Sequence, residues 1–520
     1  MPEGSRLADL LSALSLATDL GVGAPLETSQ RTCLVAVTLG AELGLAGEAL
    51  ATVFYAALMR HLGCTAWAHE AAELVGDDHD LTRTFEGVDR ERRTQLLSRA
   101  VGHLAAGAPL GTRVRSVARA LSHPAAGARL AAAQCAQAEA LAADLELGAP
   151  VIEALSQMYE RYDGRGAPLG LRGPAISVAG QLVHLAQVLE ALHRQRGRDA
   201  TLAELARRRG GQFAPELCTL AQRARDRVWA TLTAADPWER VLAAEPEPHR
   251  VLAPTKVEDV ALAFARFADL KSPHRVGHST SVAELVVAAA RRAGLSTNER
   301  ARLHIAALLH DLGTTSVSNA TWDHPGPLGA AAWEQVRLHA YHGERILVRS
   351  PVTRPYAALV GAHHERLDGG GYHRGASGDA IEWPARILAA ADAWVALTAS
   401  RPHRAALSAA GAARALHRDT GEGRLCRQAA ALVLAAAGQP APRVELPAGL
   451  TDREGEVLGL VARGLTSKEI AASLGITTRT VKHHIEHIYE KTGVSTRAAA
   501  ALFAARHNLV ALGGPGPNDA

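Results

Sequence analysis

The spacing of apolar and polar residues predicts a chain built almost entirely from helices. Long stretches such as LVVAAARRAGL and AAALVLAAAG are rich in alanine and leucine, which lose little conformational entropy in a helix. Runs of Val, Ile and Thr that alternate with polar residues, the pattern of a half-buried strand, are rare. We therefore expect an all-α protein.

Two proline-dense segments interrupt this helical pattern, at residues 236–256 and 438–449. Proline lacks the backbone N–H that a helix needs and biases the preceding residue toward extended geometry. These segments are predicted to link three domains, which span residues 1–235, 256–437 and 448–512.

The first two predicted domains repeat each other. Residues 54–65, 158–170 and 181–192 (FYAALMRHLGCT, MYERYDGRGAPLG, QLVHLAQVLEAL) match residues 304–315, 363–375 and 386–397 (HIAALLHDLGTT, HHERLDGGGYHRG, RILAAADAWVAL). Because three separated segments recur in the same order, the sequence predicts a duplicated helical domain.

Composition narrows the class of protein. Of 520 residues, 48% are hydrophobic and 21% charged, as in soluble globular proteins, and the net charge of +3 means that any nucleic-acid surface must be local. The start of the chain lacks a signal-peptide pattern, and no run of about 18 apolar residues predicts a membrane span. The five cysteines are scattered and form no CxxC pair, which favours a cytoplasmic location.

Histidine is concentrated in the second domain, where 11 of the chain's 24 histidines lie between His274 and His403. Neutral imidazole and carboxylate ligands suit transition metals, and buried polar groups in apolar helices need such a partner. Ser272 and Pro273 are expected to open a helix with His274 and His278 on one face. The candidate ligands are His278, His310, Asp311, His339, His363, His364 and Asp392.

The alternative is that these are hydrogen-bonded core histidines and helix-capping carboxylates. The repeat argues against it, because the first domain keeps the helical pattern without the ligands. Only His123 is expected to retain a counterpart, His339. The other matching positions hold Thr28, Arg60, His61, Met158, Tyr159 and Gln187, so we expect the first domain to bind no metal.

The second domain resembles the HD-GYP phosphohydrolases of the HD superfamily. The resemblance is carried by LLHDLG, RLHAYHGERIL, HHERLDGGGY and ADAWVALTASRPHR. It implies an all-helical domain in which those seven ligands hold two Fe or Mn ions. It also implies that the domain cleaves cyclic di-GMP or a related phosphodiester. His310 and Asp311 would be the catalytic pair, with Asp311 bridging the ions. Glu365 or Asp368 is expected to accept hydrogen bonds from the imidazoles, or else to form loop hydrogen bonds.

Four positions depart from the family pattern. Thr314 replaces the usual lysine after the His-Asp step, and His373 replaces the proline of Gly-Tyr-Pro. His274 and Val395 stand where acidic residues are common. The metal ligands are thus retained while groups that face phosphate are missing, so we expect slow hydrolysis.

The last domain resembles the LuxR-type helix-turn-helix. Thr451 with Glu454, and Thr466 with Glu469, predict capping boxes that open two helices. A second helix of the motif is expected from about Thr478, with its amino-terminal part facing DNA. The alternative is a four-helix protein-binding module. The expected DNA-facing residues are Lys468, Thr480, Lys482 and His484.

Together these features predict an all-α protein with two tandem HD-like domains, the first degenerate, followed by a four-helix LuxR-type domain. The predicted function is a DNA-binding transcription regulator with a metal-dependent phosphodiesterase domain, a homodimer without a membrane anchor. The alternative is a receptor that binds a nucleotide or metal without turnover and controls the DNA-binding module.

Overall fold

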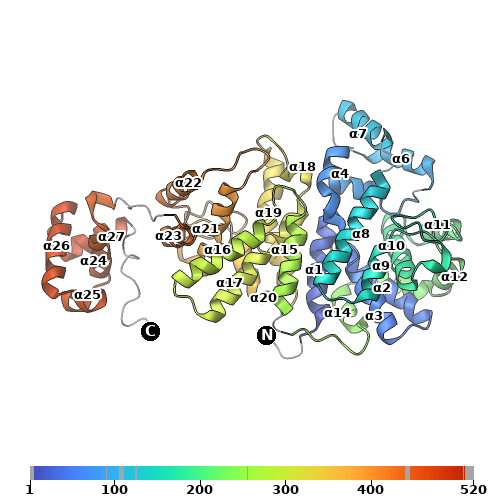
Figure 1. Cartoon of the computed structure of the whole chain (residues 1–520), viewed down its shortest axis with the longest axis horizontal. Coiled ribbons are helices and arrows are strands. Elements are labelled where there is room, and N and C mark those ends of the chain that lie inside the picture. The colour runs from blue at the N-terminus through green and yellow to red at the C-terminus, as the bar shows by residue number, and fades with distance from the viewer. Residues whose placement is uncertain are drawn as a thin grey trace. The chain divides into compact units, whose positions relative to one another are not determined.

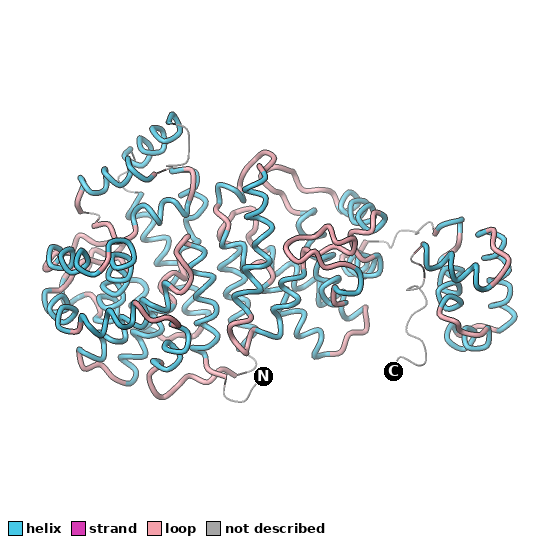
Figure 2. Tube along the Cα trace, turned by 180° about the vertical axis from the view of Figure 1, so that it is seen from behind, coloured by secondary structure: helices cyan, strands magenta, loops and turns pink. Residues whose placement is uncertain are grey.

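In the computed structural model the chain is all-α, with helices joined by loops and short 3₁₀ turns (Figures 1 and 2). The structure describes residues 5–89, 91–104, 110–122, 126–253, 256–439, 446–507 and 509. Among these residues, β pairing is limited to isolated bridges, and no helix is long and apolar enough to span a membrane. The predicted all-α class is confirmed. The chain divides into two compact units, Met1–Gln439 and Pro440–Ala520.

The first half of the larger unit contains the degenerate copy of the repeat. Its helix α1 is buried along almost its whole length, and α2, α3 and α10 pack around it or around one another. The helices are α1 (Leu7–Gly21), α2 (Thr28–Glu42), α3 (Gly47–Leu58), α4 (Ala68–Val75), α5 (Asp78–Phe85), α6 (Arg93–His103), α7 (Leu110–Ser122), α8 (Ala126–Asp144), α9 (Ala149–Ser156), α10 (Val178–Arg196), α11 (Arg198–Arg208), α12 (Pro215–Arg223), α13 (Arg225–Leu232) and α14 (Pro237–Ala244).

The second half contains the copy that retains the candidate ligands. Its helix α17 opens with a capping box in which Ser296 and Glu299 exchange hydrogen bonds, and it ends directly before His310. The helices are α15 (Lys256–Asp269), α16 (His278–Arg292), α17 (Thr297–Leu309), α18 (Asn319–Trp322), α19 (Ala330–Leu347), α20 (Arg354–Ala362), α21 (Trp383–Thr398), α22 (Ala409–Gly421) and α23 (Arg427–Ala436).

The two halves share one continuous hydrophobic core, and α1 packs directly against α19 (Figure 1). Thr315 donates to the carbonyl of Ala17 at 3.1 Å, and Thr65 donates to the carbonyl of Phe267 at 3.0 Å. A buried ion pair also joins them, with Lys271 Nζ 2.7 Å from the Asp78 carboxylate. The half with the candidate ligands is therefore held against the degenerate half by hydrogen bonds, an ion pair and a shared core.

The composition of segment 236–256 predicted a linker between the halves, but the segment packs against the first half instead. It contains α14, whose Trp238 and Val241 are buried. Glu245, just after α14, is also buried and accepts a hydrogen bond from the Tyr55 hydroxyl at 2.6 Å. Proline interrupts the helices here without preventing the segment from packing on the first half.

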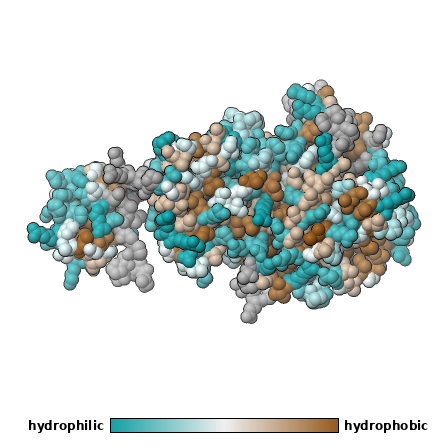
Figure 3. Space-filling view, viewed as in Figure 1, coloured by the Kyte–Doolittle hydropathy of each residue, from teal (hydrophilic) through white to brown (hydrophobic). Residues whose placement is uncertain are grey.

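The smaller unit has its own core, and its described residues form four α-helices: α24 (Asp452–Ala462), α25 (Ser467–Leu474), α26 (Thr478–Thr492) and α27 (Arg497–Arg506). The capping boxes predicted at Thr451 and Thr466 are both present. Gly475 ends α25 with φ of 64°, a left-handed conformation that glycine adopts without strain. On the face drawn in Figure 3, hydrophobic residues lie scattered among hydrophilic ones over both units.

Candidate metal centre and nucleic-acid interface

Five segments of the second half bring all seven candidate ligands to one place. His278 is the first residue of α16, His310 and Asp311 follow α17, and His339 lies within α19. His363 and His364 follow α20, and Asp392 lies within α21. Two triads have potential ligand atoms within 4.8 Å of one another: His278, His310 and Asp311; and His339, His363 and His364.

Asp311 lies between the two triads. Its Oδ2 is 3.3 Å from Nε2 of His278 and 3.1 Å from Nε2 of His310. Its Oδ1 is 3.4 Å from Nε2 of His339. Each carboxylate oxygen therefore faces a different triad, as a ligand shared by two metal ions would.

Asp392 completes the first triad and approaches the second. Its Oδ1 is 3.1 Å from Nε2 of His278, and its Oδ2 is 3.8 Å from Nδ1 of His364. The cluster thus contains five imidazoles and two carboxylates, a nitrogen and oxygen donor set that suits Fe, Mn or Zn.

The helix that carries His278 begins later than its sequence suggests. Residues 272–277 form turns, and Gly277 precedes α16 with φ of 78°. The expectation that Ser272 caps this helix and that His274 shares a face with His278 is therefore wrong. The serine instead donates to the Asp323 carboxylate at 2.6 Å, which holds the turn in place.

Backbone carbonyl groups orient three of the imidazoles. Nδ1 of His310 lies 2.6 Å from the carbonyl of Ala307, and Nδ1 of His339 lies 2.6 Å from that of Val336. Nδ1 of His363 likewise lies 2.5 Å from the carbonyl of Val360. An Nδ1–H that donates to a carbonyl leaves Nε2 free to bind a metal.

These contacts correct the expectation that Glu365 or Asp368 orients the histidines. The Glu365 carboxylate accepts from the backbone N–H groups of Arg374 and Ala376, and Asp368 accepts from that of Gly370. Both residues shape the loop after His364, the alternative considered for them. Gly371 is required there, because a Cβ atom would lie 2.6 Å from the Glu365 Cα.

Burial and neighbouring charges shift the pKa values of the groups in the cluster in different directions. Burial lowers the pKa of His363 to about 3 and holds that of His364 well below its ordinary range. Burial opposes ionisation of Asp311 as well, but Arg275 and His310 outweigh it and keep the pKa of Asp311 well below its usual value. Burial lowers the pKa of His310 too, but Asp311 outweighs burial and raises that pKa to about 9, so a cation bound here would displace a proton from His310. His363 and His364 are already neutral, the state in which an imidazole binds a divalent cation.

Two ring nitrogens of the cluster make no hydrogen bond in the structure. Nε2 of His310 and Nδ1 of His364 are buried, and their nearest carboxylate oxygens lie 3.1 Å away on Asp311 and 3.8 Å away on Asp392. Buried polar atoms are normally paired, so orphaned ring nitrogens beside two carboxylates suit coordination.

Arg275 is a member of the site that sequence reasoning missed. Its side chain is buried, forms an ion pair with Oδ2 of Asp311, and lies 4.9 Å over the Trp322 ring. Arg401 is a second nearby cation, with Nη2 3.5 Å from Nδ1 of His278. Thr314, in the position of the family's lysine, is buried and donates to the carbonyl of Asp311 at 2.6 Å. The positive charge beside the cluster therefore comes from arginines.

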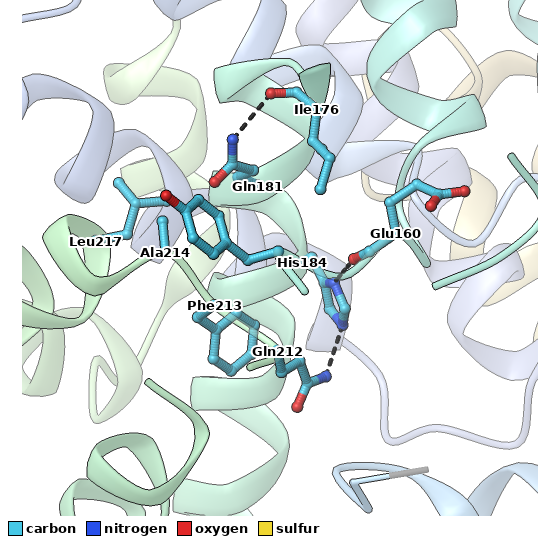
Figure 4. Close-up of a pocket in the computed structure, with 9 residues that line it drawn as sticks. Glu160, Ile176, Gln181, His184, Gln212, Phe213, Ala214 and Leu217 are labelled. Carbon is cyan, nitrogen blue, oxygen red and sulfur yellow. Dashed lines mark hydrogen bonds between the residues drawn. The ribbon is translucent and has the colours of Figure 1, made fainter. Parts of the chain in front are cut away.

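The degenerate half repeats the supports of this site but not its ligands. Glu160 accepts from the N–H groups of Leu169 and Leu171, as Glu365 accepts from Arg374 and Ala376. A small cavity of about 10 Å³ beside Glu160 is lined in part by His184, whose ring contacts the Glu160 carbonyl and the Gln212 side chain at 2.9 Å each (Figure 4). That cavity is large enough for one water molecule only.

The same comparison corrects the match proposed for His339. A Cβ on Gly313 would collide with the carbonyl of His339, and one on Gly63 would collide with that of Gln134. Gln134 is therefore the structural counterpart of His339, while His123 lies outside the described residues. Tyr159, in the position of His364, donates to Gln134 at 2.8 Å. A side-chain hydrogen bond thus stands where the second half has two of the candidate metal ligands.

In the smaller unit, the four expected DNA-facing residues lie on the two helices of the motif. Lys468 is exposed in α25, and Lys482 is exposed in α26. Thr480 and His484 are half-buried, and the Thr480 hydroxyl contacts that of Thr477 at 2.8 Å. The amino-terminal part of α26 therefore presents two exposed cations, Arg479 and Lys482, together with the hydrogen-bonding side chains of Thr480 and His484, as a recognition helix does.

Comparison with known proteins gives the class of the chain. Residues 128–217 and 263–427 match the HD domain family, and residues 448–504 match the luxR family of bacterial regulatory proteins. The chain belongs to the HD-domain family of metal-dependent phosphohydrolases and carries a LuxR-type DNA-binding domain at its carboxy-terminal end. Both predicted relationships are confirmed.

Individual relatives share most of the larger unit or only the smaller one. The chain is 32% identical to 3′3′-cGAMP-specific phosphodiesterase 3 of Vibrio cholerae serotype O1 over 407 residues, which cover 77% of this chain and 88% of that protein. A crystal structure of a V. cholerae cyclic GMP-AMP-specific phosphodiesterase covers 84% of this chain and 98% of that one at 27% identity, with a TM-score of 0.58. Over 68 residues, 13% of this chain and 32% of the relative, the chain is 44% identical to the response regulator VraR of Staphylococcus aureus.

Proposed function

We propose that the chain hydrolyses a cyclic dinucleotide of the 3′3′-cGAMP type and couples this reaction to DNA binding. The observation that carries the proposal is the position of Asp311, whose two oxygens face separate imidazole groups. The V. cholerae relatives named for this substrate support it over cyclic di-GMP, the substrate expected from sequence. The proposed ligands are His278, His310, Asp311, His339, His363, His364 and Asp392.

Two bound Fe or Mn ions would neutralise phosphodiester oxygens and lower the pKa of a bound water toward neutrality. The protein's own contribution is to hold the donor atoms in place before substrate arrives. The backbone carbonyls behind His310, His339 and His363 fix the rings, and Asp311 holds the two groups together. Such preorganisation removes the cost of reorienting dipoles during the reaction.

Arg275 and Arg401 are proposed to supply the positive charge that Thr314 lacks. Both guanidinium groups lie at the edge of the cluster, next to Asp311 and His278. Arginine stays charged when buried and binds phosphate through paired N–H groups. A substrate phosphate at the metal centre would therefore meet an arginine rather than the family's lysine.

The alternative is a receptor that binds the nucleotide without cleaving it. The ion pair between Arg275 and Asp311 favours this alternative, because it engages one of the oxygens that a metal would need. In either case the proposed regulator binds DNA as a homodimer in the cytoplasm, since regulators of this type read paired half-sites. Sedimentation of the full chain with and without DNA tests the dimer.

The test of hydrolysis is product formation from 3′3′-cGAMP and from cyclic di-GMP, with Mn²⁺ or Fe²⁺, under anaerobic conditions. The wild type should cleave 3′3′-cGAMP, and Asp311→Asn should abolish the reaction. Asp379→Asn is the matched control, because Asp379 is fully exposed in its loop. Binding without cleavage by the wild type would replace the enzyme with the receptor.

A further inference from the structure

The degenerate half carries an open groove of about 560 Å³, the size range of pockets that hold small ligands. It is lined by the Gly23 to Pro25 loop together with Arg83, Glu86, Arg99, Arg194 and Gln195. Neither the metal centre nor the DNA-binding module uses these residues.

The groove is lined by segments that also carry counterparts of the candidate ligands. Gly23 to Pro25 precede α2, whose first residue Thr28 holds the position of His278. Arg194 and Gln195 end α10, which carries Gln187 in the position of Asp392. His61, in the position of Asp311, has its pKa lowered by burial and Arg60 and, more weakly, by Arg194 from the groove. The groove is therefore lined by parts of the same segments that carry counterparts of the candidate ligands.

This degenerate site favours an anion over a cation. Arg60, in the position of His310, is only 1% exposed, and its Nε and Nη1 have no hydrogen-bond partner. At the groove itself, three arginines face one carboxylate, that of Glu86, which already pairs with Arg194 at 2.7 Å. Arg83 forms an ion pair with Asp80 at 3.9 Å, in which both side chains are exposed. Of the three arginines, Arg99 alone has no carboxylate partner among the described residues; its guanidinium donates to the Gln195 side chain at 3.5 Å.

Arg83 and Arg99 come from a segment that the second half does not match in length. They lie on α5 and α6, between the two repeated motifs that end at Thr65 and begin at Met158. The corresponding stretch of the second half, from Thr315 to His363, is much shorter. The additional length of the first half therefore supplies two of the three arginines of the groove.

We propose that this groove binds a phosphate-bearing ligand of nucleotide size without metal and without cleaving it. Arginine guanidinium groups recognise phosphate through paired, charge-assisted hydrogen bonds. Thr28, Arg60, Met158 and Gln187 supply no metal-binding set, so no hydroxide can be generated there. The proposal goes beyond the phosphodiesterase function and does not depend on it.

The test is calorimetric titration of 3′3′-cGAMP into the full chain carrying Asp311→Asn, with EDTA present, so that the metal-dependent site is inactive. We expect saturable binding that Arg83→Ala with Arg99→Ala weakens at least tenfold. Arg223→Ala with Arg225→Ala is the matched control: both residues are exposed on α12 and α13 of the same half, and the same charge is removed.

Inorganic pyrophosphate as competitor distinguishes a site for phosphate alone from one that also recognises the nucleoside. Competition at concentrations similar to those of 3′3′-cGAMP assigns the site to phosphate, and much weaker competition assigns it to the nucleotide. No saturable binding of either compound, or equal weakening by both arginine pairs, would overturn the proposal. Loss of hydrolysis in the metal-loaded wild type would leave it untouched, because binding is measured without metal.

Discussion

Replacing Arg275 by methionine should strengthen metal binding. The guanidinium is buried and pairs with Oδ2 of Asp311, the same oxygen that faces His278 and His310. A divalent ion held by this triad must therefore displace Arg275 or remain beside a fixed positive charge. Methionine keeps much of the apolar stem that packs near Trp322 but removes the charge.

The magnitude follows from the charges. Two unit charges about 4 Å apart interact by about 4 kcal/mol at an effective dielectric constant of about 20, so a divalent ion beside Arg275 would be repelled by about 8 kcal/mol. Most of this is relieved if the guanidinium turns away, at the expense of its ion pair. We therefore expect a gain of at least about tenfold in metal affinity, or about 1.4 kcal/mol.

The assay is competition between the metal-free protein and a chromophoric chelator for Mn²⁺. The matched control is Arg302→Met, which removes a half-buried arginine paired with Glu382 and away from the cluster. The control should leave the affinity within twofold of the wild type. An affinity of Arg275→Met equal to or weaker than the wild type would show that Arg275 does not compete with the metal.

Three further outcomes follow from the described contacts. Asp78→Ala should lower the free energy of unfolding by about 3–5 kcal/mol, because Lys271 stays buried without its partner. Adding Lys271→Met should restore most of this stability. Urea unfolding measures both variants, and a double variant no more stable than Asp78→Ala would contradict the prediction. Burial and Lys271 lower the pKa of His79 to about 3, so the stability it contributes above pH 6.5 is lost as the pH falls toward 3. His79→Gln should therefore gain on the wild type by up to about 1.4 kcal/mol per pH unit in that window, and a constant difference between the two proteins would refute the reasoning. Lys482→Ala should weaken DNA binding on all sequences and reduce the salt slope by about 1 in gel shifts at several salt concentrations; an unchanged slope would mean that Lys482 contacts no phosphate.

Local patterns predicted the helices and the composition of the site. Alanine-rich stretches and capping pairs such as Thr451 with Glu454 act within a few residues, so they can be read before any tertiary contact is known. The candidate ligands were identified from motifs that occur in the same order as in the HD-GYP family. The structure brings all seven together. Their assignment as metal ligands remains a prediction.

Other features depend on contacts that no local pattern records. Arg275 reaches Asp311 because residues 272–277 turn instead of extending α16. The acceptors behind the imidazoles are backbone carbonyls, which every residue has and which therefore leave no sequence signal. The counterpart of His339 was misplaced because the first half is longer at this point, so spacing alone could not identify Gln134.

The most direct test of the account is the metal content of the full chain. The protein would be reconstituted anaerobically with Mn²⁺, freed of unbound ions and submitted to elemental analysis beside His310→Ala with Asp311→Ala. The account predicts about two ions per wild-type chain and a large loss in the double variant, because Asp311 faces both imidazole groups. Equal metal contents in the two proteins, or a wild type at background level, would contradict a binuclear centre built on these residues.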